Sequence, residues 1–180
     1  MTTKQRKVEI VEYNPQWPHF FNELSGVIST AIGDLALRIE HIGSTSVPGL
    51  AAKSIIDLTV VIASREFLPE TIYRLAVLGY EHEGDLGIPG REAFAREGED
   101  VPRDETGRKW PAHHLYVCAQ DNAELARHVA FRDYLRDNRE EARSYEKLKY
   151  QLAQQFAYDV EAYCEAKTHF VNRILKQAKK

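Results

Sequence analysis

The chain has 180 residues, of which 43% are hydrophobic and 28% charged, and its formal net charge is -3. This balance is typical of one globular domain with a buried core, and it excludes a disordered chain and a membrane-spanning protein. The chain as a whole also lacks the positive charge that favours long nucleic acids, so nucleic acid is not an expected partner.

The first residues and the cysteines predict a soluble, cytoplasmic protein. The segment MTTKQRKVEIVEY has no apolar core of signal-peptide length. No other segment approaches the roughly 18 apolar residues of a membrane span. Cys118 and Cys164 lie far apart within apolar segments, so we expect two buried, reduced thiols and no disulfide.

The first third of the chain alternates between patterns of extended and helical structure. In chain order we expect an extended arm over 7–14, a helix over 18–32, and strands over 35–42 and 55–62. The second strand is apolar on both faces apart from Asp57 and Thr59, as is typical of a central strand. Because strand side chains alternate, Asp57 and Thr59 should share one face.

The rest of the chain predicts more strands and then only helices. We expect a helix over 68–78, a strand near 80–83, a hairpin of strands near 91–96 and 112–118, and helices from about 121 onward. The hairpin loop over 97–111 is long and rich in charge, Gly and Pro, so we expect a mobile loop that could act as a lid. A single domain over 1–180 is predicted, with a mixed α/β part over about 1–120 and a helical part over about 121–180.

The segment EHIGSTSVPGLAAKSIIDLTVVI carries the strongest functional pattern. Gly43 and Ser44 follow a strand and can offer backbone N–H groups and a hydroxyl to a phosphate, although such a pair can also be only a turn. Lys53 can neutralise a phosphate or pair with a carboxylate. Asp57 is costly to bury as a charge unless a cation, a hydrogen-bond donor or water meets it. The segment does not match a Walker A loop.

The same segment closely resembles the signature of the GrpB family. Later blocks, among them HHLYV, FRDYLR, YEKLKYQLA and YCEAKTHFV, follow in the order of that family, so the resemblance covers nearly the whole chain. It implies an α+β fold with a nucleotidyltransferase-like mixed β-sheet, packed helices and a C-terminal helical part. The GrpB domain also occurs fused to dephospho-CoA kinases in some bacteria.

The resemblance implies a small-molecule nucleotide or another phosphate-bearing ligand, held together with Mg²⁺. In that arrangement Gly43, Ser44 and Lys53 bind phosphates and Asp57 is the catalytic residue that holds the metal. Transferases of this fold place a second carboxylate two residues further along the strand, where this chain has Thr59. Because two Mg²⁺ ions need two or three carboxylates, the alternative is a non-catalytic binding or accessory module on a degenerate nucleotidyltransferase fold.

Two other acids and a histidine bear on these alternatives. Glu40 or Glu92 could supply the missing carboxylate if either reached within about 5 Å of Asp57. His114 is a candidate catalytic proton shuttle, with a structural role as the alternative. A zinc site made by His41, Asp57 and His114 is not expected, because no closely spaced Cys/His pattern supports it.

Several further residues are candidates for the same pocket, with ion pairs or core packing as the alternative role of each. The pocket candidates are His41, Thr59, Arg91, Tyr116, Arg132 and Lys149. An Arg132–Asp133 pair is the expected form of that alternative for Arg132. The sequence predicts no oligomeric state.

Overall fold

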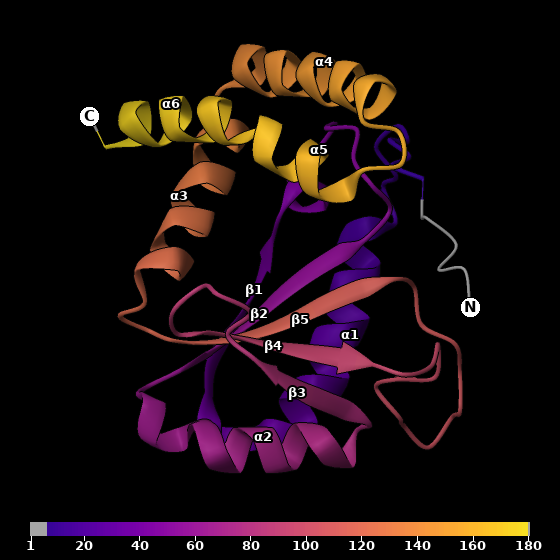
Figure 1. The fold of residues 1–180 in the computed structure, drawn as a ribbon. Coiled ribbons are helices and arrows are strands. Elements are labelled where there is room, and N and C mark those ends of the chain that lie inside the picture. The colour runs from indigo at the N-terminus through magenta and orange to yellow at the C-terminus, as the bar shows by residue number, and fades with distance from the viewer. Residues whose placement is uncertain (1–6, 180) are drawn as a thin grey trace.

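A five-stranded mixed β-sheet in the order β1-β2-β5-β4-β3 forms the centre of the fold (Figure 1). The structure is a computed structural model, and it describes residues 7–179. The strands are β1 (Ala36–Ile42), β2 (Ile56–Ile62), β3 (Tyr80–Gly84), β4 (Arg91–Arg96) and β5 (His113–Ala119). Strands β2 and β5 run parallel, whereas the other neighbouring pairs are antiparallel. The predicted α+β fold with a mixed sheet is confirmed.

Some of the helices cover the two faces of this sheet, while the last three group beyond one end of it (Figure 1). The helices are α1 (Trp17–Ile32), α2 (Leu68–Val77), α3 (Ala123–Asp137), α4 (Arg139–Gln155), α5 (Val160–Ala166) and α6 (Thr168–Ala178). Helices α1 and α2 pack on the main apolar core, while α3 contacts β1 and leads into α4, α5 and α6. The helical part therefore begins close to the predicted position.

The alternation of side chains along β2 separates the core from the functional face. Leu58 and Val60 join the main core with residues of α1, whereas Val61 packs on the other face against Cys118 and Leu125. Asp57 and Thr59 have the same parity as Val61, so they face the side on which α3 packs. Asp57 and Thr59 thus share one face of the central strand, as the sequence predicts, and the structure shows that this face looks toward the C-terminal helices.

The loop over 97–111 is anchored to the main core by two of its residues, while its mobility and the role of a lid stay predictions. Val101 and Trp110 are buried in the main core beside α1. The Trp110 indole donates a hydrogen bond to the carbonyl of Pro102 at 2.7 Å, and the guanidinium of Arg108 lies 3.6 Å from the indole centroid. Val101 and Trp110 therefore anchor this loop to the core, although its charged composition predicted a mobile loop.

The N-terminal arm and the cysteines show how segments distant in sequence meet. Val11 pairs with Ala52 in an isolated antiparallel bridge, which confirms the predicted extended arm. Both cysteines are free, as predicted, but only Cys118 is buried, whereas Cys164 of α5 is exposed. Among the described residues, no helix combines the length and the apolar character needed to cross a bilayer.

Candidate functional site

A cavity of about 280 Å³, here called the main cavity, lies where the starts of β2 and β5 meet the turn after β1 and helices α4 and α5. Seven of the predicted site residues line it: Gly43, Ser44, Lys53, Asp57, His114, Tyr116 and Lys149. Tyr145 of α4, Tyr163 and Cys164 of α5, and Lys167 complete its functional lining. The structure therefore brings together the quoted segment and two C-terminal helices.

Four predicted pocket residues lie outside the lining, and His41 is the clearest case. His41 pairs with Leu58 across the strands and stacks on Phe21 of α1, with the ring centroids 4.6 Å apart. Its Nε2 lies 3.0 Å from Thr45 Oγ1, and burial lowers the pKa of His41 to about 4. His41 therefore faces α1 whereas Asp57 faces the C-terminal helices, so the two side chains lie on opposite faces of the sheet.

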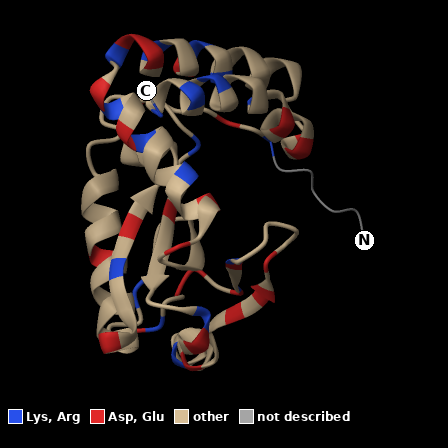
Figure 2. Cartoon of the chain, turned by 90° about the vertical axis from the view of Figure 1, so that its left-hand side faces the viewer, with Lys and Arg blue, Asp and Glu red and all other residues tan. Residues whose placement is uncertain are grey.

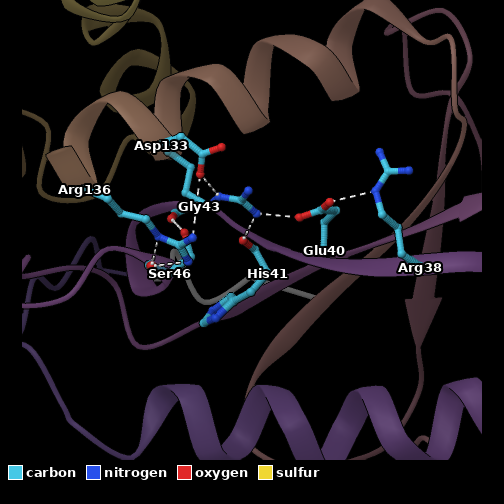
Figure 3. Close-up of polar contacts among 8 residues, drawn as sticks. Arg38, Glu40, His41, Gly43, Ser46, Asp133 and Arg136 are labelled. Carbon is cyan, nitrogen blue, oxygen red and sulfur yellow. Dashed lines mark hydrogen bonds and ion pairs between the residues drawn. The ribbon is translucent and has the colours of Figure 1, made fainter.

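The other three residues outside the lining are Thr59, Arg91 and Arg132, and each is buried or contacts a neighbouring side chain. Thr59 is buried. The guanidinium of Arg91 lies 4.4 Å from the centroid of the Tyr116 ring. Arg132 forms the predicted pair with Asp133, with Nε donating to Oδ1 at 2.7 Å, and it also binds Glu40 (Figure 3).

The turn after β1 approaches Asp57 so closely that only glycine fits at position 43. Gly43 has a φ of +71°, and a Cβ placed there would lie 2.2 Å from Asp57 Oδ2. Ser46 Oγ donates to the carbonyl of Gly43 at 2.6 Å and holds the turn in this conformation. The short turn Ser44–Ser46 then directs the chain along the rim of the main cavity.

Gly43→Ala is expected to lower the free energy of unfolding by about 2 kcal/mol, because the methyl group meets the Asp57 carboxylate and the backbone is strained for a residue with a side chain. Urea denaturation followed by circular dichroism measures this change. Gly26→Ala is the matched control: Gly26 lies within α1 with open space around it, and alanine should stabilise that helix by about 1 kcal/mol. Equal effects of the two substitutions would contradict the steric argument.

Asp57 and His114 form a hydrogen-bonded pair on neighbouring parallel strands. They are register partners, and His114 Nδ1 lies 2.9 Å from Asp57 Oδ1. The other carboxylate oxygen lies beside the backbone of Gly43. A carboxylate on one ring nitrogen fixes the orientation of an imidazole, which suits proton transfer by the second nitrogen.

Neither of the two expected acids joins Asp57. Glu40 accepts hydrogen bonds from Arg132 at 2.6 Å and from Arg38 at 2.8 Å (Figure 3). Glu92 pairs with Val117, whose side chain lies in the main core, so it faces away from Asp57. Within residues 7–179, no three His, Cys, Asp or Glu side chains form a group that could hold a metal. The donor set therefore does not fit the two-metal site of a nucleotidyltransferase.

Three lysines give the main cavity a positive charge. Lys149 is 2% exposed, and its ammonium donates to the carbonyl of Ala51. Burial, reinforced by the nearby Lys167, lowers the pKa of Lys149 to about 7, and burial also lowers the pKa of Lys167. Among the ion pairs of the described chain, none uses Lys53, Lys149 or Lys167. Asp57 is the one carboxylate that lines this cavity in the part of the chain the structure describes.

The C-terminal helices supply residues that the sequence interpretation assigned to packing or to ion pairs. Along the ribbon, positions of Lys and Arg are interspersed with positions of Asp and Glu (Figure 2). Lys149 Nζ lies 4.9 Å from the Tyr145 centroid, and Lys167 Nζ lies 4.3 Å from that of Tyr163. Both pairs have the spacing Tyr-x-x-x-Lys, which puts the ring and the ammonium on one helix face. This repeated spacing is the signal that could have identified Tyr145 and Tyr163 from sequence, whereas the sequence already offers Lys167 as a basic residue of an anion pocket, with a salt bridge as its alternative.

Comparisons with known proteins find sequence and structural similarity over most of the chain. The family model described as GrpB protein matches residues 7–177. UPF0157 protein YqkA of Bacillus subtilis is 34% identical over 98% of this chain, which spans 48% of the length of YqkA. The crystal structure of conserved protein GrpB from Enterococcus faecalis matches at a TM-score of 0.80 and 36% identity, covering 94% of this chain and 96% of that one.

Two further similarities are partial. A dephospho-CoA kinase of Mycolicibacterium paratuberculosis is 36% identical over 41% of this chain, corresponding to 19% of the kinase. The structure of Cid1 in complex with its short product ApU matches at 15% identity and a TM-score of 0.46. The match covers 80% of this chain and 39% of the Cid1 chain. A likeness of this weakness supports no inference about function.

Proposed function

This chain belongs to the GrpB family, and from that premise we propose that it binds a nucleotide or another phosphate-bearing small molecule in the main cavity. The observation that carries the proposal is the set of three lysines, Lys53, Lys149 and Lys167, that meet around one cavity and, within residues 7–179, form no ion pair with a carboxylate. A buried ammonium without a counter-ion costs free energy. An anionic ligand removes this cost and raises the pKa of Lys149 again.

The arrangement of the lining suits a phosphate group. Lys149 comes from α4, Lys167 from the turn between α5 and α6, and Lys53 from the segment before β2, so cations surround a ligand from several sides. The Ser44 hydroxyl is a further donor at the rim. Tyr145 and Tyr163 stay protonated because burial raises the pKa of both phenols well above the usual value, so each keeps an O–H donor.

Magnesium and nucleotidyl transfer are the finer part of the proposal. A single Asp57 carboxylate, already bound to His114, holds Mg²⁺ only when the phosphates of a ligand complete the coordination. The geometry therefore favours a phosphate-binding module whose lysines neutralise the ligand. A Mg²⁺-dependent nucleotidyltransferase is the second candidate, which the position of Asp57 beside the Gly43–Ser44 turn supports.

Isothermal titration calorimetry with ATP, GTP, CTP and UTP tests the proposal, each nucleotide being titrated once with Mg²⁺ and once with EDTA. We expect at least one nucleotide to bind under both conditions, and Lys167→Met to weaken its binding about tenfold, since each lost charge contact costs roughly 1.4 kcal/mol or more. Lys147→Met is the control, because Lys147 is exposed on α4 and does not line the cavity.

The outcomes separate the two candidates. Binding that disappears on chelation would favour the Mg²⁺-dependent transferase over the binding module. If neither these four nucleotides nor pyrophosphate bound to the wild-type protein, the proposal of a phosphate-binding cavity would fail.

A further inference from the structure

A second cavity of about 300 Å³, here called the arm cavity, adjoins the main cavity. It lies between the N-terminal arm, the segment before β2 and the first residue of α5, Val160. Lys53, Ile55 and His114 line both cavities. A ligand in the main cavity can therefore extend past these three residues into the arm cavity.

The arm cavity differs from the main cavity in its chemistry. Val8, Val11, Ile55 and Val160 give it apolar walls, Ser54 and Glu9 add a hydroxyl and a carboxylate, and the exposed Lys7 adds an ammonium. Valine and isoleucine side chains can cover the apolar face of a flat ring, and a carboxylate accepts hydrogen bonds from hydroxyl or amino groups. Such walls suit an uncharged group with hydrogen-bond donors, whereas the three-lysine lining of the main cavity suits phosphates.

The junction between the two cavities supports one continuous ligand. Lys53 Nζ lies 5.6 Å from the centroid of Tyr163 in the main cavity and also lines the arm cavity. The side chain of His114 is 49% exposed and is oriented by Asp57 at the same junction. Each cavity alone is at the lower end of the roughly 300–1,000 Å³ that small-molecule sites occupy, and the two together fall within that range.

We propose that the arm cavity binds the nucleoside part of a nucleotide whose phosphates lie in the main cavity. The inference rests on the proposed function, because it needs the phosphates to be held by the three lysines. It adds that the ligand is recognised in two parts. The main cavity binds its phosphates, and the arm cavity, which the N-terminal arm lines, binds its base and ribose. His114 then lies beside the bond that joins the two parts.

Calorimetry with two probes tests this inference: the tightest-binding of ATP, GTP, CTP and UTP, and inorganic tripolyphosphate, which lacks a nucleoside. The wild-type protein should bind the nucleotide at least about tenfold more tightly than tripolyphosphate. Val160→Trp should fill the arm cavity and weaken nucleotide binding about tenfold while leaving the tripolyphosphate affinity unchanged. Val160 is 41% exposed, so the indole need not enter the core.

Val77→Trp is the matched control, because Val77 is 69% exposed at the end of α2 and lines neither cavity. It should change neither affinity. Equal wild-type affinities for the two probes would overturn the inference, and so would a Val160→Trp variant that binds the nucleotide normally or that loses both probes equally. Failure of the proposed function would differ from these results, because the wild-type protein would then bind neither probe.

Discussion

Arg132→Leu is expected to lower the free energy of unfolding by about 3 kcal/mol, the largest loss predicted for this chain. Arg132 Nη1 donates to Glu40 Oε2 at 2.6 Å and to the carbonyl of His41 at 3.0 Å (Figure 3). Its Nε donates to Asp133 at 2.7 Å, and its side chain is 10% exposed. One guanidinium thus joins α3 to β1. Its removal leaves the poorly solvated Glu40 carboxylate with Arg38 as its remaining arginine partner, which costs free energy.

The pKa of Glu40 reflects the same balance of forces. Burial raises it, but the hydrogen bonds and charges of Arg132 and Arg38 outweigh burial, so the pKa of Glu40 lies below its usual value. Chemical denaturation at pH 7 measures the stability of the variant. Arg127→Leu is the control on the same helix: the Arg127 side chain is 48% exposed and Glu124 also pairs with His128, so the loss should be less than about 1 kcal/mol. Comparable small losses in both variants would contradict a structural role for Arg132.

Lys149→Met is expected to have opposite effects on stability and on binding. Methionine fills a similar volume without a charge, so the free energy of unfolding should rise by about 1–4 kcal/mol, as for other buried ionic groups replaced by apolar ones. Nucleotide affinity should fall at least about tenfold, because the most deeply buried of the three cations is lost. A residue that lowers stability and increases affinity is typical of a binding site.

The stability difference should depend on pH in a definite direction. Burial lowers the pKa of Lys149 from 10.5 to about 7. Between pH 7 and 10.5 the unfolded chain therefore binds more protons than the folded protein, and the unfolding free energy of the wild type rises with pH. The stabilisation by Lys149→Met should be largest at or below pH 7 and should shrink as the pH rises toward 9.

Urea denaturation at pH 6 and pH 9 measures this dependence, with calorimetry for the affinity. Lys147→Met removes the same charge from an exposed position of α4, so it should alter neither stability nor affinity by more than a small amount. A Lys149→Met protein that is less stable than the wild type at pH 6 would show that the ammonium is well compensated, and it would weaken the case for an anionic ligand.

The elements near the site could be predicted because their signals are local. Alternating apolar residues identified β1, and a β-prone run that is apolar on both faces identified β2. The period of two then placed Asp57 and Thr59 on one face before any partner strand was known. The glycine at position 43 was visible as part of a turn after a strand. What the turn accomplishes was not visible, because the 2.2 Å approach of a Cβ to Asp57 depends on the pairing of β1 with β2.

Composition and spacing did not predict which side chains of a charged segment are buried or which partners they contact. The loop over 97–111 is mostly charged, yet Val101 and Trp110 fix it in the core. Glu40 and Glu92 were candidate metal ligands, but the first is held by arginines and the second faces the opposite side of the sheet. Neither fact follows from the spacing of these residues, since both depend on which elements pack against them.

The sequence by itself therefore determined the α+β order of elements, the turn at Gly43 and the face of Asp57, because hydrogen-bond periodicity and backbone sterics act over a few residues. Only the tertiary structure decided that Lys53, Lys149 and Lys167 share one cavity and that His41 does not. Lys53 and Lys167 are more than a hundred positions apart along the chain. Their charges meet because α4 and α5 pack over the starts of β2 and β5, a placement set by the burial of apolar side chains and not by any local pattern.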